Sequence, residues 1–301
     1  MMGRSPNTIS DEIARNRVKG AYDPLKAHHK AYVRRQDAKY QGMKIVEHPD
    51  LKAFVEKHLY DDQSPENIAG RVTVREKHLP TISKESIYRY ISSVYGRRVE
   101  YHRSQRKARR KHRRTRVQKL TDRTFIEKRP VSINKRMRIG NAEADFIVSG
   151  KEGTGILLTV VDRKVRVAFL EQILAVTIEA VHAAFVRIKR RYPELQTFTT
   201  DNDILFRNHR ELARLLGVNI YFCHPYHSWE KGSVENANGV IRHTIPKGSD
   251  ISQYSKRFIR SMEDKLNRRI MECLDYRTPA EALDTARKQK KLRERRRQRK
   301  K

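Results

Sequence analysis

The chain has 301 residues, of which 37% are hydrophobic and 34% charged, and its formal net charge is +32. The chain is too long for a single helical module. Because its apolar fraction is low, we expect the hydrophobic core to be concentrated in about residues 140–245, where most long apolar runs lie. The strong positive charge predicts a nucleic-acid partner. Membrane-spanning and disulfide-stabilised secreted proteins are excluded, because the chain has no signal peptide, only Cys223 and Cys273 as cysteines, and no apolar stretch of the ~20 residues that cross a bilayer. We therefore expect no membrane partner and a reducing, cytoplasmic compartment.

Residues 1–20 predict a short isolated helix. Ser5 is a suitable N-cap, Pro6 suits the first helical position, and Ile9 and Ile13 fall on one face. A recognition helix has this pattern but needs a supporting helix before it, and only four residues precede Ser5. We interpret the segment as a partial first helix-turn-helix, with a plain surface helix as the alternative. The side chains expected to contact DNA are Asn7, Ser10 and Arg15.

Residues 49–95 predict a second helix-turn-helix of three helices. They begin at Pro49, at Ser64 and at Ser83, where a serine or a proline marks a helix start. Small three-helix units without a DNA role are common, but the basic segment that follows favours DNA binding. The candidate DNA contacts on the third helix are Lys84, Ser86 and Arg89.

Two basic segments supply 21 of the 32 net positive charges. Residues 97–119 carry twelve Lys or Arg and one acid, and residues 286–301 carry eleven and one. We expect residues 96–139 to be a linker that orders only on phosphate contact, with a possible helix over 101–118. The C-terminal segment, 286–301, is either a DNA-binding tail or simply a solvated one.

Residues 140–250 predict an α/β domain, because alternating and helical apolar patterns succeed one another there. Residues 251–285 predict a helical C-terminal part, in which apolar residues recur at intervals of four. The expected strands are 143–148, 155–161, 165–170, 197–200 and 218–222, and the expected helices are 177–192, 210–216 and 233–244.

Three acids stand out within this apolar region. Asp145 lies in the first expected strand on the same face as Glu143, Asp201 ends a later strand, and Glu235 lies on a helix. Three carboxylates that meet at a sheet edge can hold two Mg²⁺ ions, with Mn²⁺ as a substitute, and so catalyse phosphoryl transfer. Spacing alone leaves open that they are unrelated surface acids, and Asp162 fits a turn better.

Local motifs resemble the IS-thirty (IS30) family of bacterial insertion-sequence transposases over about residues 3–283. The 33 residues between Asp201 and Glu235 match the interval in that family. The matching segments are 3–10, 64–69, 86–91, 200–202, 224–239, 241–242, 246–250, 266–269 and 278–281.

The resemblance implies an α/β ribonuclease-H-like catalytic core, a mixed sheet flanked by helices, with an N-terminal all-α helix-turn-helix region that binds DNA. It implies a catalytic and metal-binding triad of Asp145, Asp201 and Glu235. It also implies a DNA transposase that recognises terminal inverted repeats, frees a 3′-hydroxyl and joins it to target DNA. Two element ends must be brought together, so we expect a homo-oligomer on double-stranded DNA in the bacterial cytoplasm.

The chain departs from the family pattern at two places. Ala142 and Ala144 replace a tryptophan and a glycine beside the first acid, and Asp203 replaces a glycine, which predicts a strained turn. A catalytically decayed remnant that only binds DNA is therefore an alternative, and a nuclease that cuts without joining is another.

The segment around Glu235 holds further candidates. His224 and His227 have a spacing that can bind metal, but zinc would need more ligands, so a place beside DNA phosphate is favoured. Trp229 is either a core anchor or a stacking surface for a base or sugar. The remaining candidates are Lys231 and Arg242 as phosphate contacts, and Asn236 and Asn238 as supports of the metal-bound carboxylate or helix caps.

Overall fold

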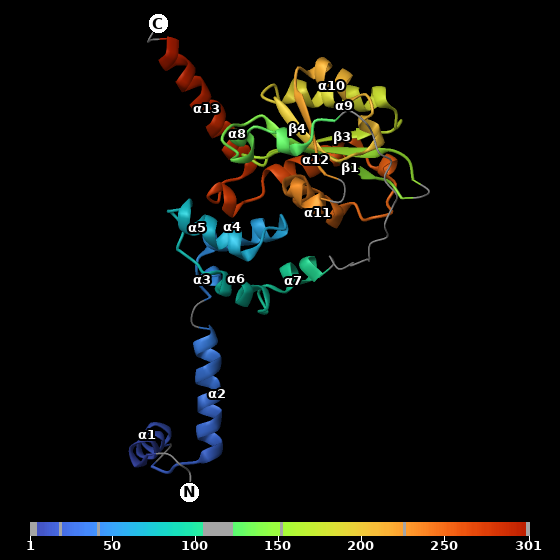
Figure 1. Cartoon of the computed structure of the whole chain (residues 1–301). Helices are drawn as coiled ribbons and strands as arrows, with labels where there is room; N and C mark the ends of the chain where they lie inside the picture. Colours follow the sequence, from blue (N-terminus) through green and yellow to red (C-terminus); the bar gives the residue numbers. More distant parts are fainter. Residues whose placement is uncertain are drawn as a thin grey trace.

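The computed structural model describes residues 5–17, 20–40, 43–104, 123–150, 153–224 and 227–298. Three parts follow one another along the chain: two N-terminal helices, a compact unit of five short helices, and a sheet covered by helices (Figure 1). In none of these ranges is a helix both long and apolar enough to cross a membrane.

The first part consists of α1 (Pro6–Asn16) and α2 (Pro24–Tyr40). The helix α1 begins as expected, because the Ser5 hydroxyl accepts a hydrogen bond from the Thr8 N–H. The sequence did not predict α2, since its many basic and polar residues form no apolar stripe. The polar candidates Asn7, Ser10 and Arg15 are exposed on α1, and their contact with DNA stays a prediction.

The second part packs around one small core. Ser64 and Ser83 cap helices there as expected, each accepting a hydrogen bond from the backbone N–H three residues later. Ile87 and Tyr90 are buried, whereas Lys84 and Arg89 are exposed on the same helix. Its helices are α3 (Lys44–Glu47), α4 (Pro49–Tyr60), α5 (Pro65–Val74), α6 (Lys84–Ile91) and α7 (Arg97–Ser104).

The basic linker does not begin at residue 96 as expected, because residues 97–104 form α7 and belong to the five-helix unit. Val99 is buried in the core of the five-helix unit, so one apolar side chain anchors a segment that is otherwise charged. The greater part of the helix expected over 101–118 lies outside the described residues.

The third part is built on a five-stranded sheet of order β3-β2-β1-β4-β5. The first three strands are antiparallel neighbours, and β4 and β5 run parallel to β1. This topology is that of a ribonuclease-H-like core and confirms the expected fold class. The strands are β1 (Asn141–Val148), β2 (Ile156–Asp162), β3 (Ala168–Ile173), β4 (Thr197–Thr200) and β5 (Asn219–Phe222).

Helices cover both faces of the sheet (Figure 1). Alternation along β1 places Ala142 and Ala144 in one core, under α9 and α10, and Ile147 in the other, under α11 and α12. The odd-numbered face of β1, which carries Asp145, therefore looks towards α11. The covering helices are α9 (Ile178–Arg191), α10 (His209–Leu216), α11 (Gly232–Thr244) and α12 (Lys256–Asn267).

Residues 123–139 pack on the sheet rather than forming a free linker. Phe125 makes a parallel bridge with Phe222 of β5, and buried Arg129 donates a hydrogen bond to the Thr199 hydroxyl. The expectation that this stretch orders only on phosphate contact is wrong, because a few apolar and hydrogen-bonded anchors suffice at a sheet edge. It contains η1 (Ile126–Lys128) and α8 (Val131–Asn134).

The C-terminal part ends in α13 (Pro279–Gln298), after η4 (Ile251–Gln253), α12 and η5 (Glu272–Leu274). Ala282 and Leu283 anchor the start of α13 in the main core, and its later turns are exposed. The basic segment expected to be a tail is thus helical as far as it is described. Both cysteines are free.

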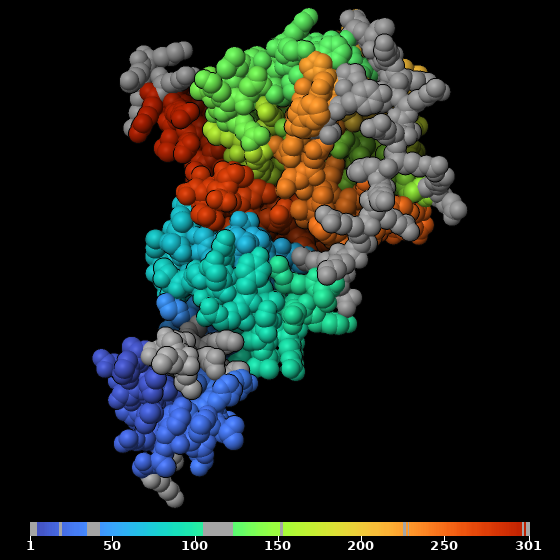
Figure 2. All heavy atoms as spheres, turned by 60° about the horizontal axis from the view of Figure 1, so that its bottom comes forward, coloured from blue at the N-terminus to red at the C-terminus, as the bar shows by residue number. Residues whose placement is uncertain are grey.

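The five-helix unit docks on the segment that joins α12 to α13 and on the first turn of α13 (Figure 2). Arg71 of α5 forms two hydrogen bonds of 2.6 and 2.8 Å with the Glu281 carboxylate. Asn67 donates a 2.8 Å hydrogen bond to the Ile270 carbonyl, and Gln63 accepts one of 2.9 Å from the Ile270 N–H. Polar contacts of this kind fix the orientation of one part relative to the other.

The Arg71–Glu281 pair makes this docking sensitive to acid. Hydrogen bonding to Arg71 lowers the pKa of Glu281 from 4.5 to about 2, so its contribution to stability is complete above about pH 4.5 and disappears as the pH falls through about 2. We expect Glu281→Gln to lower the melting temperature at neutral pH, and the difference from wild type to shrink between pH 4.5 and 2. Glu294→Gln, at an exposed position of the same helix, is the control, and an equal effect of both variants would contradict the prediction.

Candidate active site

Asp145 lies within β1, beside the point where the neighbouring strand β4 ends and Asp201 follows. The parallel register pairs Glu143 of β1 with Thr199 of β4, and each aspartate follows two residues later. Residues two apart share a face of a strand, so both carboxylates lie on the face towards α11. Their side chains keep 22% and 48% of their accessible surface, which leaves the pair open to solvent on one side.

Lys231 lies between the two aspartates. Its Nζ is 3.0 Å from Asp145 Oδ1 and 3.2 Å from Asp201 Oδ2, and only 4% of the residue is exposed. Burial raises the pKa of Asp145, and the charge of Asp201 adds to this, whereas Lys231 opposes it. Burial by itself would lower the pKa of Lys231, but the two carboxylates outweigh it and the pKa is raised. The lysine expected to contact phosphate is thus engaged with the acids, and a phosphate contact would require it to move.

The helix α11 brings Glu235 to the same side. Its neighbour Asn238 donates a 2.8 Å hydrogen bond to Asp145 Oδ2. Lys231 ends η3 (Ser228–Lys231), immediately before α11, whereas Glu235 and Asn238 lie three residues apart on α11 and so share one face of that helix. The side chain of Glu235 is exposed, and among the described residues its carboxylate does not form with those of Asp145 and Asp201 a group whose ligand atoms all lie within 4.8 Å of one another.

Glu143 fixes the start of α11. This buried carboxylate accepts hydrogen bonds from the N–H groups of Ser233 (2.7 Å) and Val234 (3.1 Å), at the positive end of the helix. Arg163 Nε donates to its other oxygen at 3.0 Å. The sequence predicts that Glu143 shares a strand face with Asp145, but it does not predict the hydrogen bonds from Ser233 and Val234, about 90 residues away.

The donor set suits a hard divalent cation. Asp201 Oδ1 and Asn238 Oδ1 are buried and have no hydrogen-bond partner among the described residues. Oxygen atoms of carboxylates and amides are the ligands that Mg²⁺ and Mn²⁺ take in proteins. The ammonium group of Lys231 already lies where a positive charge is favoured.

The other acids and the departures from the family pattern have local explanations. Asp162 is buried in the turn, as expected, and accepts hydrogen bonds from the N–H groups of Lys164 and Val165. The strain expected at Asp203 is absent, because its φ is −68° and its carboxylate accepts a hydrogen bond from the Leu205 N–H. Both alanines beside Asp145 pack in the core under α9.

The remaining candidates lie around α11. Trp229 is 69% exposed, so it is not a core anchor, and the stacking role stays a prediction. Arg242 donates hydrogen bonds to the carbonyl oxygens of Pro246 and Val148, beside the site. Asn236 is exposed, so a role as support of a metal-bound carboxylate stays a prediction.

Comparison with known proteins places the whole chain among bacterial transposition proteins. The chain is 35% identical to the transposase for insertion sequence element IS4351 of Bacteroides fragilis, over 93% of this chain and 86% of that protein. It is 30% identical to the transposase InsI for insertion sequence element IS30A of Escherichia coli K12, over 94% and 76%. No family model matches. Among solved structures, the catalytic core domain of BIV integrase aligns with 50% of this chain and 97% of its own, with a TM-score of 0.39 and 18% identity.

Proposed function

Because the chain belongs to the IS-thirty family and is a DNA transposase, we propose that Asp145, Asp201 and Glu235 hold two divalent metal ions that cut and join DNA strands. The observation that carries the proposal is the meeting of Asp145 and Asp201 around the Lys231 ammonium group. Asn238 of α11 also contacts Asp145, and Glu235 shares its face of that helix, which supports including Glu235 in the proposed site.

In this proposal each residue of the site has its own role. Asp145, which Asn238 of α11 contacts, would contribute to both metal positions, and Asp201 and Glu235 would each contribute to one. When bound, Mg²⁺ or Mn²⁺ supplies charge that stabilises the attacking and leaving oxygens of an in-line phosphoryl transfer. Asn238 holds the Asp145 carboxylate in place, and the Lys231 ammonium group supplies a positive charge to the pair of aspartates. A Lys231 ammonium group displaced from the aspartates would be free to reach a DNA phosphate.

Double-stranded DNA is the substrate in this proposal, both the terminal inverted repeats and the target. A cavity of about 460 Å³ lies between the five-helix unit and the start of α11, and its lining includes Arg136, Arg166 and Arg269. Arg269 Nη1 is buried without a partner among the described residues, so a phosphate group there would satisfy it. Two element ends must be held at once, which favours a homo-oligomer on DNA.

The exposed face of α6 would read the element ends. We expect Arg89→Ala to weaken binding to end DNA and, if the contact is to a phosphate, to reduce the slope of log K against log salt by about 1. Fluorescence anisotropy at several salt concentrations measures both quantities. Lys57→Ala, at an exposed position of α4, is the control, and equal effects of the two variants would remove α6 from the interface.

The test of the function uses the wild-type chain and duplex oligonucleotides carrying the element ends. The proposal predicts nicks with 3′-hydroxyl ends and joined products with Mg²⁺ or Mn²⁺, and neither with EDTA. Binding without any nicking would identify the decayed remnant instead, and nicking without joining would identify a nuclease.

A further inference from the structure

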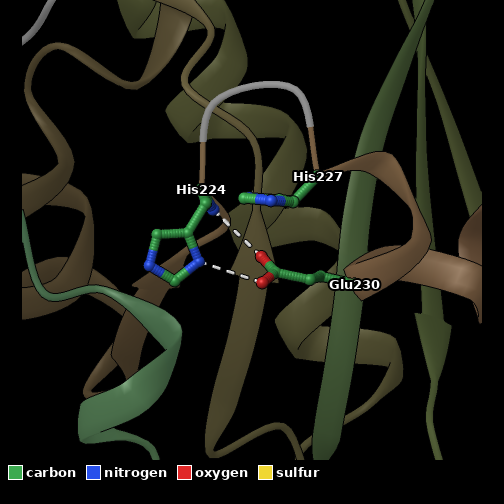
Figure 3. Close-up of side chains that lie close together, drawn as sticks. All are labelled: His224, His227 and Glu230. Atoms are coloured by element: carbon green, nitrogen blue, oxygen red, sulfur yellow. Dashed lines mark hydrogen bonds and ion pairs between the residues drawn. The ribbon is translucent and has the colours of Figure 1, made fainter.

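The loop between β5 and α11 carries a second group of metal-type side chains. His224, His227 and Glu230 each offer one ligand atom, and these atoms all lie within 4.8 Å of one another. In Figure 3 both histidine rings lie beside the Glu230 carboxylate. It is the one cluster of three or more such side chains within the described ranges, and it shares no residue with the proposed catalytic acids.

His224 and Glu230 already hold each other in a geometry that a metal ion can take over. His224 Nδ1 is 2.9 Å from Glu230 Oε1, and the His224 backbone N–H donates a 2.9 Å hydrogen bond to Glu230 Oε2. Zinc lies about 2.0–2.2 Å from nitrogen and carboxylate ligands, so it can replace a proton between atoms this close.

The other nitrogen of His224 has the partner that zinc-bound histidines usually have. His224 Nε2 contacts the carboxylate of Glu127, which comes from η1 on a distant part of the chain. A carboxylate that accepts the second N–H of a ligating histidine fixes its tautomer and orientation. Phe125 also stacks on the ring, with centroids 5.6 Å apart and planes 8° apart.

His227 offers a ring nitrogen that is available as a metal ligand. Its Nδ1 is buried and has no hydrogen-bond partner among the described residues. An unsatisfied buried polar atom is destabilising, and a bond to a metal ion would remove that penalty. The ring is held in place by an edge contact with Trp229, at a centroid distance of 4.5 Å.

We propose that His224, His227 and Glu230 bind one Zn²⁺ ion, with Glu127 orienting His224 and a water molecule completing the coordination. Imidazole nitrogens with one carboxylate oxygen suit zinc, whereas Mg²⁺ prefers oxygen ligands alone. The charges of Glu127 and Glu230 balance that of the ion. The sequence indicates only the two histidines, and the fold adds Glu230 from the same loop and Glu127 from η1.

The ion would stiffen the approach to the catalytic face. Glu230 immediately precedes Lys231, and α11 begins at the next residue. A metal that ties Glu230 to His224 at the end of β5 therefore limits the movement of Lys231 and of the first turn of α11. The zinc site is thus a positioning device beside the site of the proposed chemistry.

The test is a calorimetric titration of the full chain with Zn²⁺. It is done in the Asp145→Asn, Asp201→Asn, Glu235→Gln background, so that zinc in the catalytic site does not interfere and the result is independent of the proposed function. We expect one ion per chain, loss of this binding in His227→Ala and in Glu230→Gln, and binding weakened about 10–100-fold in Glu127→Gln. Substitution with Co²⁺ should give the visible absorption of a tetrahedral complex.

His243→Ala, which removes an exposed histidine of α11, is the control and should bind as the parent does. Circular dichroism checks that each variant is folded, and His227→Gln repeats the test if the alanine variant is not. Absence of binding in the parent, or unchanged stoichiometry and affinity in the His227 and Glu230 variants, would overturn the proposal.

Discussion

Glu235→Gln should reduce strand cleavage by about a thousandfold or more while leaving the affinity for end DNA within about twofold of wild type. A divalent ion in such a site contributes several kcal/mol to the transition state, and each 1.36 kcal/mol is tenfold in rate. Glutamine keeps the size of the side chain and removes its charge. Because Glu235 is exposed, the fold should be unaffected.

Single-turnover cleavage of a labelled end duplex measures this effect, and anisotropy measures binding. Glu211→Gln, which neutralises an exposed glutamate of α10 away from the three acids, is the matched control and should cleave normally. Near-normal cleavage by Glu235→Gln would exclude it from the metal site, whereas loss of binding together with cleavage would indicate a structural role.

Glu143→Gln should lower the free energy of unfolding of the sheet domain by about 3–5 kcal/mol, the usual cost of breaking a buried ion pair. Its partner Arg163 is only 7% exposed, and the neutral amide leaves that charge without a counter-ion. The amide oxygen can still accept one N–H at the start of α11, so the helix should form but be held less firmly. Urea unfolding followed by circular dichroism measures the change.

Arg187→Gln is the control for Glu143. It breaks an ion pair with Glu171 in which the arginine side chain is 47% exposed, and such pairs contribute about 0–1 kcal/mol. A similar small loss in Glu143→Gln would mean that Glu143 does not hold α11. A large loss of cleavage in the folded Glu143→Gln protein, beyond the loss of stability, would support its positioning of Glu235.

Regular patterns made much of the catalytic core predictable. Four of the five strands lie close to their expected bounds, because alternating or continuous apolar residues bounded by turns mark them. The third, expected over 165–170, is β3 over Ala168–Ile173, because the turn after Asp162 continues to Val167. Gly217, with φ of 63°, ends α10 as expected. The helix α2 was missed for the opposite reason, as it has no apolar face, and α7 is anchored by the single side chain of Val99.

The surroundings of the site were less predictable because they depend on contacts between distant segments. Lys231 and Asn238 contact Asp145 although they are 86 and 93 residues away in the sequence. Glu143 likewise accepts a hydrogen bond from the start of α11, 90 residues further along the chain. A local sequence pattern cannot predict contacts between residues this far apart in the chain. The turn at Asp203 was wrongly expected to be strained, because a family glycine was taken to require a left-handed backbone that this chain does not adopt there.

The central claim, that Asp145, Asp201 and Glu235 bind the divalent ions, is tested most directly by anomalous scattering from crystals of the wild-type chain soaked with Mn²⁺. The account predicts anomalous peaks between Asp145 and Asp201 and beside Glu235, with the Lys231 ammonium group displaced from its place between the aspartates. Lys231 retained at 3.0 and 3.2 Å from the two carboxylates, with no manganese peak at these acids, would contradict it.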